Sequence, residues 1–191
     1  MGAKGSYINR DSVGFLSDIG NIRDMNEDYI SYYEEEAFRI YVVADGMGGH
    51  NAGDVASKTA VEACISYLKS LGEFNDLEKS LRDAITYANE IIYEKANSNE
   101  NLNGMGTTIT ACLIQENNAV IANVGDSSCY VIKNNKIEKI TKDHSLVQEL
   151  LDCGSISKEQ AINHPQKNVI TRAIGTEEVV NIDLFSIEKN K

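Results

Sequence analysis

The sequence predicts an α+β fold, because amphipathic helices and short β-branched segments occupy different parts of the chain. Residues 53–71 and 77–92 carry apolar or small side chains at a spacing of three to four, which is typical of helices with one apolar face. After Gly104 the period changes to that of strands, and Asn-Asn pairs that favour hairpin turns separate the segments. Each helix therefore needs a sheet to cover, and the sheet is expected to be antiparallel.

Length, charge and cysteine content restrict the class of protein. A chain of 191 residues with a formal net charge of −11 is expected to form one domain that binds neither nucleic acid nor an anionic membrane nonspecifically. The sequence contains no run long enough to span a bilayer, no signal peptide and no Cys-x-x-Cys pair. We therefore expect a cytoplasmic protein, with residues 1–12 as a leader and residues 13–191 as the single domain.

The segment before the first helix is predicted to hold three strands. A short apolar strand is expected from Val13, and a turn follows near Gly20. Two further strands are expected at residues 29–33 and 38–44. The stretch 23–28, which precedes the second strand, is dense in groups that bind anions and cations.

The third strand leads into the stretch on which the predicted site is centred. Residues 42–44 are expected to form a buried strand that delivers Asp45 to its end, where the carboxylate can face a cleft. Three glycines follow within residues 46–49, and glycines let backbone groups approach a ligand closely. A carboxylate beside an accessible carbonyl suits Mg²⁺ or Mn²⁺. The alternative for an isolated Asp-Gly pair is a tight turn from a strand into a helix.

The remaining elements are expected to be short, apart from the second helix, which Asn75 is expected to cap. Strands within residues 106–114, 119–124, 129–132 and 136–140 are predicted to form an antiparallel meander, with hairpin turns at Asn117-Asn118 and Asn134-Asn135. Two short helices are expected at residues 145–153 and 158–163, and a last strand at residues 179–187.

Four acidic residues are expected in turns or at strand ends: Glu27, Asp28, Asp45 and Asp126. Asp126 directly follows an apolar strand, and Arg23 is close in sequence to the first two acids. Each acid taken alone is most simply a solvated turn residue. Together, in one antiparallel protein, they predict a site for a hard divalent cation.

Six short motifs follow one another along the chain. They are Arg23-x-x-Asn26-Glu27-Asp28, Asp45-Gly46-Met47-Gly48-Gly49-His50, Gly106-Thr107-Thr108, Val124-Gly125-Asp126-Ser127, Thr141-x-Asp143-His144-Ser145 and Ile170-Thr171-Arg172-Ala173-Ile174-Gly175. In identity and order these motifs resemble those of the metal-dependent type 2C protein phosphatases, in their bacterial form. The resemblance covers residues 13–185, and the number of motifs makes it specific.

The resemblance implies a sandwich of two antiparallel β-sheets flanked by helices, with the last strands missing from this chain. It implies that Asp45 bridges two Mn²⁺ or Mg²⁺ ions and that the Gly46 carbonyl binds one of them. Glu27 and Asp28 would act nearby, partly through water. Asp126 would help to hold a third ion.

The resemblance also implies an activity. Arg23 would clamp the phosphate of the substrate, and the reaction would be hydrolysis of phosphoserine and phosphothreonine in proteins, opposing Ser/Thr kinases. Residues 143–168 match a mobile flap that is associated with substrate choice in the family. His144 is expected to cap or pack in its turn and to take no part in catalysis.

The family pattern continues with a Ser-Asp-Gly segment and an Asp-Asn pair that complete a metal site, and this sequence contains neither. An alternative function is therefore a catalytically weak interaction domain that binds a phosphoprotein or a metal. The expected partners are phosphoprotein substrates and a cognate Ser/Thr kinase, with no nucleic acid and no membrane. An open sheet edge at residues 181–187 also predicts self-association.

Overall fold

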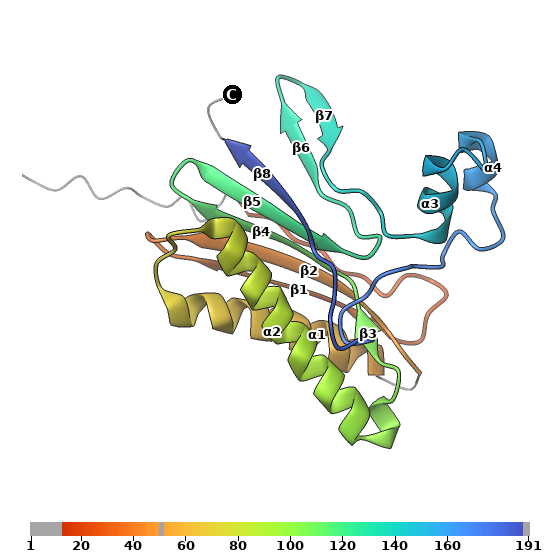
Figure 1. Cartoon of the computed structure of the whole chain (residues 1–191), viewed down its shortest axis with the longest axis horizontal. Coiled ribbons are helices and arrows are strands. Elements are labelled where there is room, and N and C mark those ends of the chain that lie inside the picture. The colour runs from red at the N-terminus through yellow and green to blue at the C-terminus, as the bar shows by residue number, and fades with distance from the viewer. Residues whose placement is uncertain (1–12, 50–51, 189–191) are drawn as a thin grey trace, which may run out of the picture.

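The computed structural model describes residues 13–49 and 52–188, which form two antiparallel sheets and four α-helices (Figure 1). The order is β1 (Asp28–Glu34), β2 (Arg39–Met47), α1 (Ala52–Leu71), α2 (Leu77–Ser98), the 3₁₀ turn η2 (Glu100–Leu102), β3 (Gly106–Thr107), β4 (Ile109–Gln115), β5 (Asn118–Val124), β6 (Tyr130–Lys133), β7 (Lys136–Lys139), α3 (Leu146–Asp152), α4 (Lys158–Ile162) and β8 (Asp183–Glu188). The predicted α+β class with two antiparallel sheets is confirmed.

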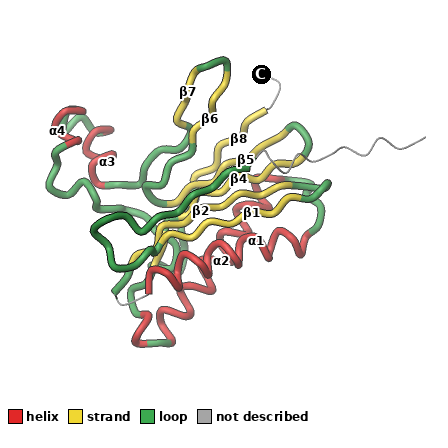
Figure 2. Tube along the Cα trace, turned by 180° about the vertical axis from the view of Figure 1, so that it is seen from behind, coloured by secondary structure: helices red, strands yellow, loops and turns green. Residues whose placement is uncertain are grey.

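The larger sheet has the order β1-β2-β4-β5-β8, and the short β3 pairs with the end of β2. Figure 2 shows its strands side by side, with α1 and α2 along one face. The expected meander is wrong beyond β5, because β8 and not β6 pairs with β5. β5 is buried over most of its length whereas β6 is largely exposed, so β6 is a poor neighbour for it. Among the described residues, β1 and β8 are the two edge strands of this sheet.

Alternation along β2 separates a face that packs on the helices from a second, open face. Ile40, Val42 and Ala44 are buried in a core that α1 and α2 share with β4 and β5. Val43 is exposed, so the expectation of a continuously buried stretch at residues 42–44 is wrong for its middle residue. Asp45 has the same parity as Val43 and therefore projects from the open face.

Residues 13–18 form no strand, which corrects the strand expected from Val13. Phe15 and Leu16 are 66% and 85% exposed. The segment runs over the open face of the larger sheet, where it lines an apolar hollow together with Tyr32 and Cys112. None of the strands within the described residues pairs with this segment, and an apolar sequence without a bonded neighbour does not form a strand by itself.

The residue that caps the second helix lies one position later than expected. Asp76, and not Asn75, precedes Leu77, and its carboxylate accepts a hydrogen bond from the Lys79 backbone amide at 2.9 Å. The two neighbours are both good capping residues, so composition alone does not choose between them.

The two hairpin turns differ in how far they follow the prediction. Asn134 and Asn135 both adopt positive φ, 51° and 60°, as a two-residue hairpin requires. In the turn between β4 and β5 the residue with positive φ is Glu116, at 53°. Asn118 is already the first residue of β5, so the turn lies one residue earlier than expected.

The part of the chain after β7 follows the prediction at its helices and departs from it at its last strand. α3 and α4 are capped by Ser145 and Ser157, within a residue or two of the expected bounds. The last strand begins at Asp183, so residues 179–182 are not part of it. Across the described residues, none of the helices is long and apolar enough to cross a membrane.

Asn89 on α2 fixes the turn that carries the chain toward β8. It is 1% exposed, and its amide nitrogen donates to the carbonyls of Glu177 and Glu178 at 3.0 and 3.1 Å. Its amide oxygen accepts from the Gly175 backbone nitrogen at 2.7 Å. Gly175 has a φ of 87° and packs so closely on Ile92 that any Cβ would collide with it. One side chain thus satisfies three backbone groups at a crowded position.

Asn89→Ala is expected to lower the free energy of unfolding by about 2–4 kcal/mol, because three backbone groups lose a partner that water cannot easily replace. Urea denaturation followed by circular dichroism measures the loss. Asn97→Ala is the matched control, since the exposed Asn97 side chain bonds only the Tyr93 carbonyl on its own helix. Equal losses in the two variants would contradict the assignment.

Candidate active site

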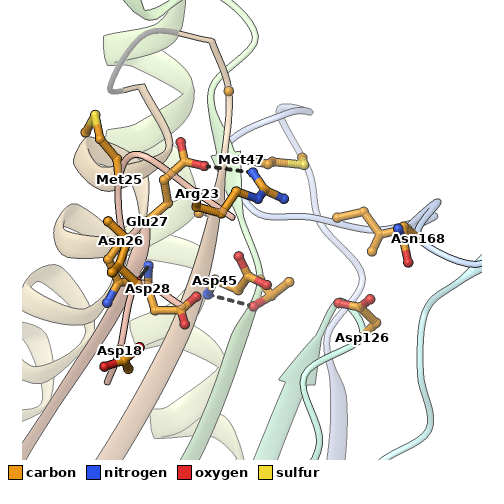
Figure 3. Close-up of a pocket in the computed structure, with 15 residues that line it drawn as sticks. Asp18, Arg23, Met25, Asn26, Glu27, Asp28, Asp45, Met47, Asp126 and Asn168 are labelled. Carbon is orange, nitrogen blue, oxygen red and sulfur yellow. Dashed lines mark hydrogen bonds and ion pairs between the residues drawn. The ribbon is translucent and has the colours of Figure 1, made fainter. Parts of the chain in front are cut away.

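A cleft of about 550 Å³ lies where the ends of several strands meet (Figure 3). It is lined by every residue that the sequence predicts for the site: Arg23, Glu27, Asp28, Asp45, Gly46 and Asp126. These residues come from the loop before β1 and its first residue, from β2 and from the loop after β5. In the view of Figure 3, Asp45 lies between Asp28 and Asp126.

Asp45 lies inside β2 and not at its end, because β3 pairs with Gly46 and Met47 and prolongs the strand. Its peptide groups are held at the junction of β3 and β4. The Asp45 amide donates to Thr108 Oγ1 at 3.0 Å. The Asp45 carbonyl accepts from Thr107 Oγ1 and from the Thr108 amide, each at 2.9 Å. The carboxylate therefore projects from a backbone that cannot turn away from the cleft.

Asp28 lies directly opposite Asp45 in the pairing of β1 with β2. Like charges at facing positions on one side of a sheet repel each other. The Asp28 amide donates to Asn26 Oδ1 at 3.0 Å, and the Asn26 side chain donates to Ser17 Oγ at 2.7 Å. The loop before β1 therefore holds Asp28 in position against this repulsion.

Gly46 and Gly53 let β2, α1 and Glu27 approach one another. A Cβ on Gly46 would overlap the Gly53 carbonyl, and a Cβ on Gly53 would overlap the Glu27 carboxylate. The Gly46 amide also donates to the Glu27 carbonyl at 3.0 Å. The Glu27 carboxylate consequently lies beside the first turn of α1, where the helix dipole favours a negative charge.

Asp126 stands between two residues of fixed conformation. Gly125 has a φ of 105°, which favours glycine, and the Ser127 hydroxyl lies 2.8 Å from Thr108 Oγ1. The same Thr108 hydroxyl accepts from the Asp45 amide. One threonine therefore sets the spacing between the segments that carry the two acids.

The acids around Asp45 alter its titration. The pKa of Asp45 is raised from 3.8 to about 6, mainly by partial burial and further by the charges of Asp28, Asp126 and Glu27. Arg23 opposes it only in part. The cleft thus concentrates negative charge in excess of what the protein's own cations neutralise.

The residues that line the cleft suit a divalent cation. Across residues 13–49 and 52–188, no three acidic, histidine or cysteine side chains are close enough to form a complete metal site by themselves. The acids instead surround a space in which their charges repel, and a cation there would remove the repulsion. Carboxylates and the Gly46 carbonyl are hard oxygen ligands of the kind that Mg²⁺ and Mn²⁺ prefer. The donor set fits an ion that keeps part of its water shell.

Arg23 lies at the rim of the cleft with its guanidinium mostly in solvent. Its side chain is 77% exposed, and its Nη1 atom is 3.9 Å from the Glu27 carboxylate. So loose an ion pair leaves most of the five donors of the guanidinium available to a ligand.

Sequence reasoning missed several residues that line the cleft: Asp18, Ile19, Met25, Thr108, Asn168 and Ile170. Thr108 belongs to a motif that the sequence analysis quoted without giving it a role. Asp18 accepts a hydrogen bond from the Gly20 amide at 2.7 Å. The turn predicted near Gly20 was therefore the one sequence feature that could have drawn attention to Asp18. Asn168 and Ile170 lie more than 40 residues beyond Asp126 in the chain. Asn168 ends the segment 143–168 and Ile170 begins the sixth motif, but neither pattern placed these side chains in the cleft.

Asp45→Asn is expected to stabilise the protein in the absence of divalent cations above pH 6. Because the pKa of Asp45 is about 6 in the folded chain and 3.8 when unperturbed, stability is lost as the pH rises through this window. Because Asp45 is half exposed to solvent, its charge is partly screened. We therefore expect the free energy of unfolding to rise by about 1 kcal/mol, which is less than the full pKa shift would give. Denaturation in EDTA at pH 8 and pH 4 measures it. The same difference at both values would contradict the electrostatic origin.

The comparison with known proteins agrees with this geometry. Residues 11–150 match the family model described as protein phosphatase 2C. The serine/threonine phosphatase Stp of Listeria welshimeri is 46% identical over an alignment of 177 residues, and the match covers 91% of this chain and 70% of the relative.

Solved structures extend the comparison to the fold. The serine/threonine phosphatase Stp1 of Staphylococcus aureus superposes with a TM-score of 0.79 at 43% identity, over 92% of this chain and 70% of the other. The catalytic domain of the phosphatase PstP, in complex with two manganese ions, superposes with a TM-score of 0.77 at 35% identity, over 91% and 70%. From the family match, the sequence identity and the shared fold together, it follows that the chain belongs to the protein phosphatase 2C family.

Proposed function

We propose that the chain hydrolyses phosphoserine and phosphothreonine in proteins, with water as the nucleophile and Mn²⁺ or Mg²⁺ held at the cleft. Family membership supports a Ser/Thr protein phosphatase, and the manganese in the related PstP structure supports the cation. The observation that carries the proposal is the group of carboxylates around Asp45, whose pKa is raised to about 6 by partial burial first and by these neighbouring charges second.

The proposed ligands follow from where the side chains lie. Asp45 stands between Asp28 and Asp126 and is the acid best placed to contact more than one ion. The Gly46 carbonyl would add a neutral oxygen ligand, while Glu27 from the loop before β1 and Asp28 at the start of β1 would act partly through water. Ions bound there supply an acidified water and positive charge opposite the phosphoryl oxygens. The protein's part is to hold these oxygen ligands at fixed spacing.

Arg23 is proposed to bind the phosphate at the mouth of the cleft. Its planar guanidinium can donate two parallel hydrogen bonds to a phosphoryl group, which a lysine cannot. Because the side chain is solvated and only loosely paired with Glu27, it can turn toward a ligand without breaking a strong contact.

The proton for the departing side-chain oxygen has no obvious protein donor. Met47 follows Gly46 at the position where some eukaryotic relatives of the family carry a histidine, and none of the described residues that line the cleft is a histidine. We propose that this proton comes from water, or that the step goes without general acid catalysis.

One observation favours the second candidate, a catalytically weak domain that binds phosphoproteins or metal. The described residues hold no complete set of three close ligands, so the ions are expected to bind weakly in this chain. Hydrolysis of p-nitrophenyl phosphate with and without Mn²⁺ separates the two candidates. The partners proposed for either are phosphoproteins and a cognate Ser/Thr kinase, and self-association through the edge of β8 stays a prediction.

Asp45→Ala is expected to reduce Mn²⁺-dependent hydrolysis of a phosphothreonine peptide by at least about 10³-fold, the effect of losing several kcal/mol of stabilisation by the ions. Initial rates at saturating Mn²⁺ measure the loss. Asp83→Ala is the control, because Asp83 pairs only with Lys79 on the surface of α2. Near-normal turnover of Asp45→Ala would show that the centre lies elsewhere.

Arg23→Ala is expected to raise KM about tenfold while lowering kcat less, because it removes a charge-assisted contact present in both the ground state and the transition state. Steady-state kinetics on the same peptide separate the two constants. Arg82→Ala, on the exposed side of α2, controls for the loss of a positive charge. A pure loss of kcat would be inconsistent with a phosphate clamp.

A further inference from the structure

His144 connects three separate parts of the structure, although it lines no part of the cleft. Its side chain is only 5% exposed and lies behind the loop that carries Asp126. The expectation that His144 packs in its turn is therefore met, but its contacts reach well beyond that turn, to Gly125, Arg172 and Asp183.

His144 holds both polar groups of the residue that precedes Asp126. The His144 amide donates to the Gly125 carbonyl at 2.9 Å, and the Gly125 amide donates to His144 Nδ1 at 3.1 Å. Gly125 has a φ of 105°. A residue in this conformation whose amide and carbonyl are both bonded to one partner has little freedom to rotate.

The hydrogen bonds determine which ring nitrogen of His144 carries the proton. A backbone amide can only donate, so Nδ1 must be the acceptor and Nε2 bears the hydrogen. Nε2 lies 3.1 Å from the Asp183 carboxylate and donates to it. Arg172 Nη1 donates to the other oxygen of Asp183 at 2.9 Å. The Arg172 and His144 nitrogens are 3.2 Å apart because they share this acceptor, and not because they bond each other.

The Asp126 loop is thus held on both sides. Thr108 holds Ser127 on one side and is itself bonded to the Asp45 amide. On the other side, Gly125 is bonded to His144. Because the contact with Asp183 orients the imidazole, the position of Asp126 depends on a residue of β8, on the far side of β5.

We infer that His144 is a positioning residue: its Nδ1 atom fixes Gly125 and thereby directs the Asp126 carboxylate toward the cation site. Asp183 acts through His144, since it selects the tautomer with a free Nδ1. The inference rests on the proposed function only for the identity of the ion that Asp126 helps to hold. Residues that contact a metal ligand, without contacting the metal themselves, commonly affect how tightly the site binds the metal.

Two substitutions separate the roles of the ring nitrogens. In His144→Asn the side-chain oxygen takes the place of Nδ1 and can accept from the Gly125 amide, while the contact with Asp183 is lost. In His144→Gln the amide group reaches the place of Nε2 and can meet Asp183, while no acceptor faces Gly125. Mn²⁺ binding to the 191-residue chain is followed by the EPR signal of free Mn²⁺, with Asp126→Asn as the reference for a lost ligand.

The weakest Mn²⁺ binding event is expected to weaken about tenfold or more in His144→Gln, as in Asp126→Asn, and to stay near that of the wild type in His144→Asn. Leu113→Ala, a buried substitution on β4 away from the cleft, controls for general destabilisation and should bind Mn²⁺ normally. All variants are measured at a temperature where circular dichroism shows them folded.

Wild-type Mn²⁺ affinity in His144→Gln would overturn the inference, and so would equal weakening of His144→Asn and His144→Gln. Normal Mn²⁺ binding by Asp126→Asn would also overturn it, because the loop would then serve no cation. The proposed function fails by a different result, which is that the wild-type chain binds Mn²⁺ but does not hydrolyse a phosphothreonine peptide.

Discussion

The site depends on how the backbone of Asp45 is held. Its amide donates to Thr108 Oγ1 and its carbonyl accepts from Thr107 Oγ1 and the Thr108 amide, so the peptide groups on both sides of its Cα atom are fixed. This contact exists because the two-residue β3 pairs with the end of β2, which prolongs β2 past the acid. Without it, the strand would end at a flexible glycine-rich turn, and the carboxylate could move away from the negative charge around it.

That constraint explains how a chain tolerates such a concentration of acids. Asp28 is held by Asn26, and the Glu27 carboxylate lies beside the first turn of α1. Each position is determined by neutral hydrogen bonds or by a helix end and not by an opposite charge. Arg23 is the one cation among the described residues that line the cleft, and because it is mostly solvated it does not cancel the repulsion. A cation that enters the cleft relieves this repulsion, and the relief adds to the free energy of cation binding.

Much of the site could be predicted from sequence because its residues belong to short motifs with local meaning. Helix periodicity and Asn-rich turns also placed most elements. Sequence could not show that β8 would replace β6 beside β5, because strand order depends on which surfaces are buried. Nor could it show the roles of Thr108 and His144, whose hydrogen bonds join residues 63 and 19 positions apart. The prediction of a strand from Val13 was wrong because an apolar pattern does not show whether another strand is present to pair with it.

The two ends of the segment that carries α3 and α4 lie next to each other. Ser145 bridges to Ile170, the Leu146 amide bonds the Val169 carbonyl, and the Thr171 amide bonds the His144 carbonyl. Both helices carry their own serine caps and stand apart from the large sheet in Figure 1. The segment could therefore be replaced or lengthened without disturbing the sheets. Each doubling of its length would cost only about 0.6 kcal/mol in loop-closure entropy. Its far end places Asn168 and Ile170 in the cleft wall, so such exchanges would alter the surface that meets an incoming protein while leaving the acids where they are.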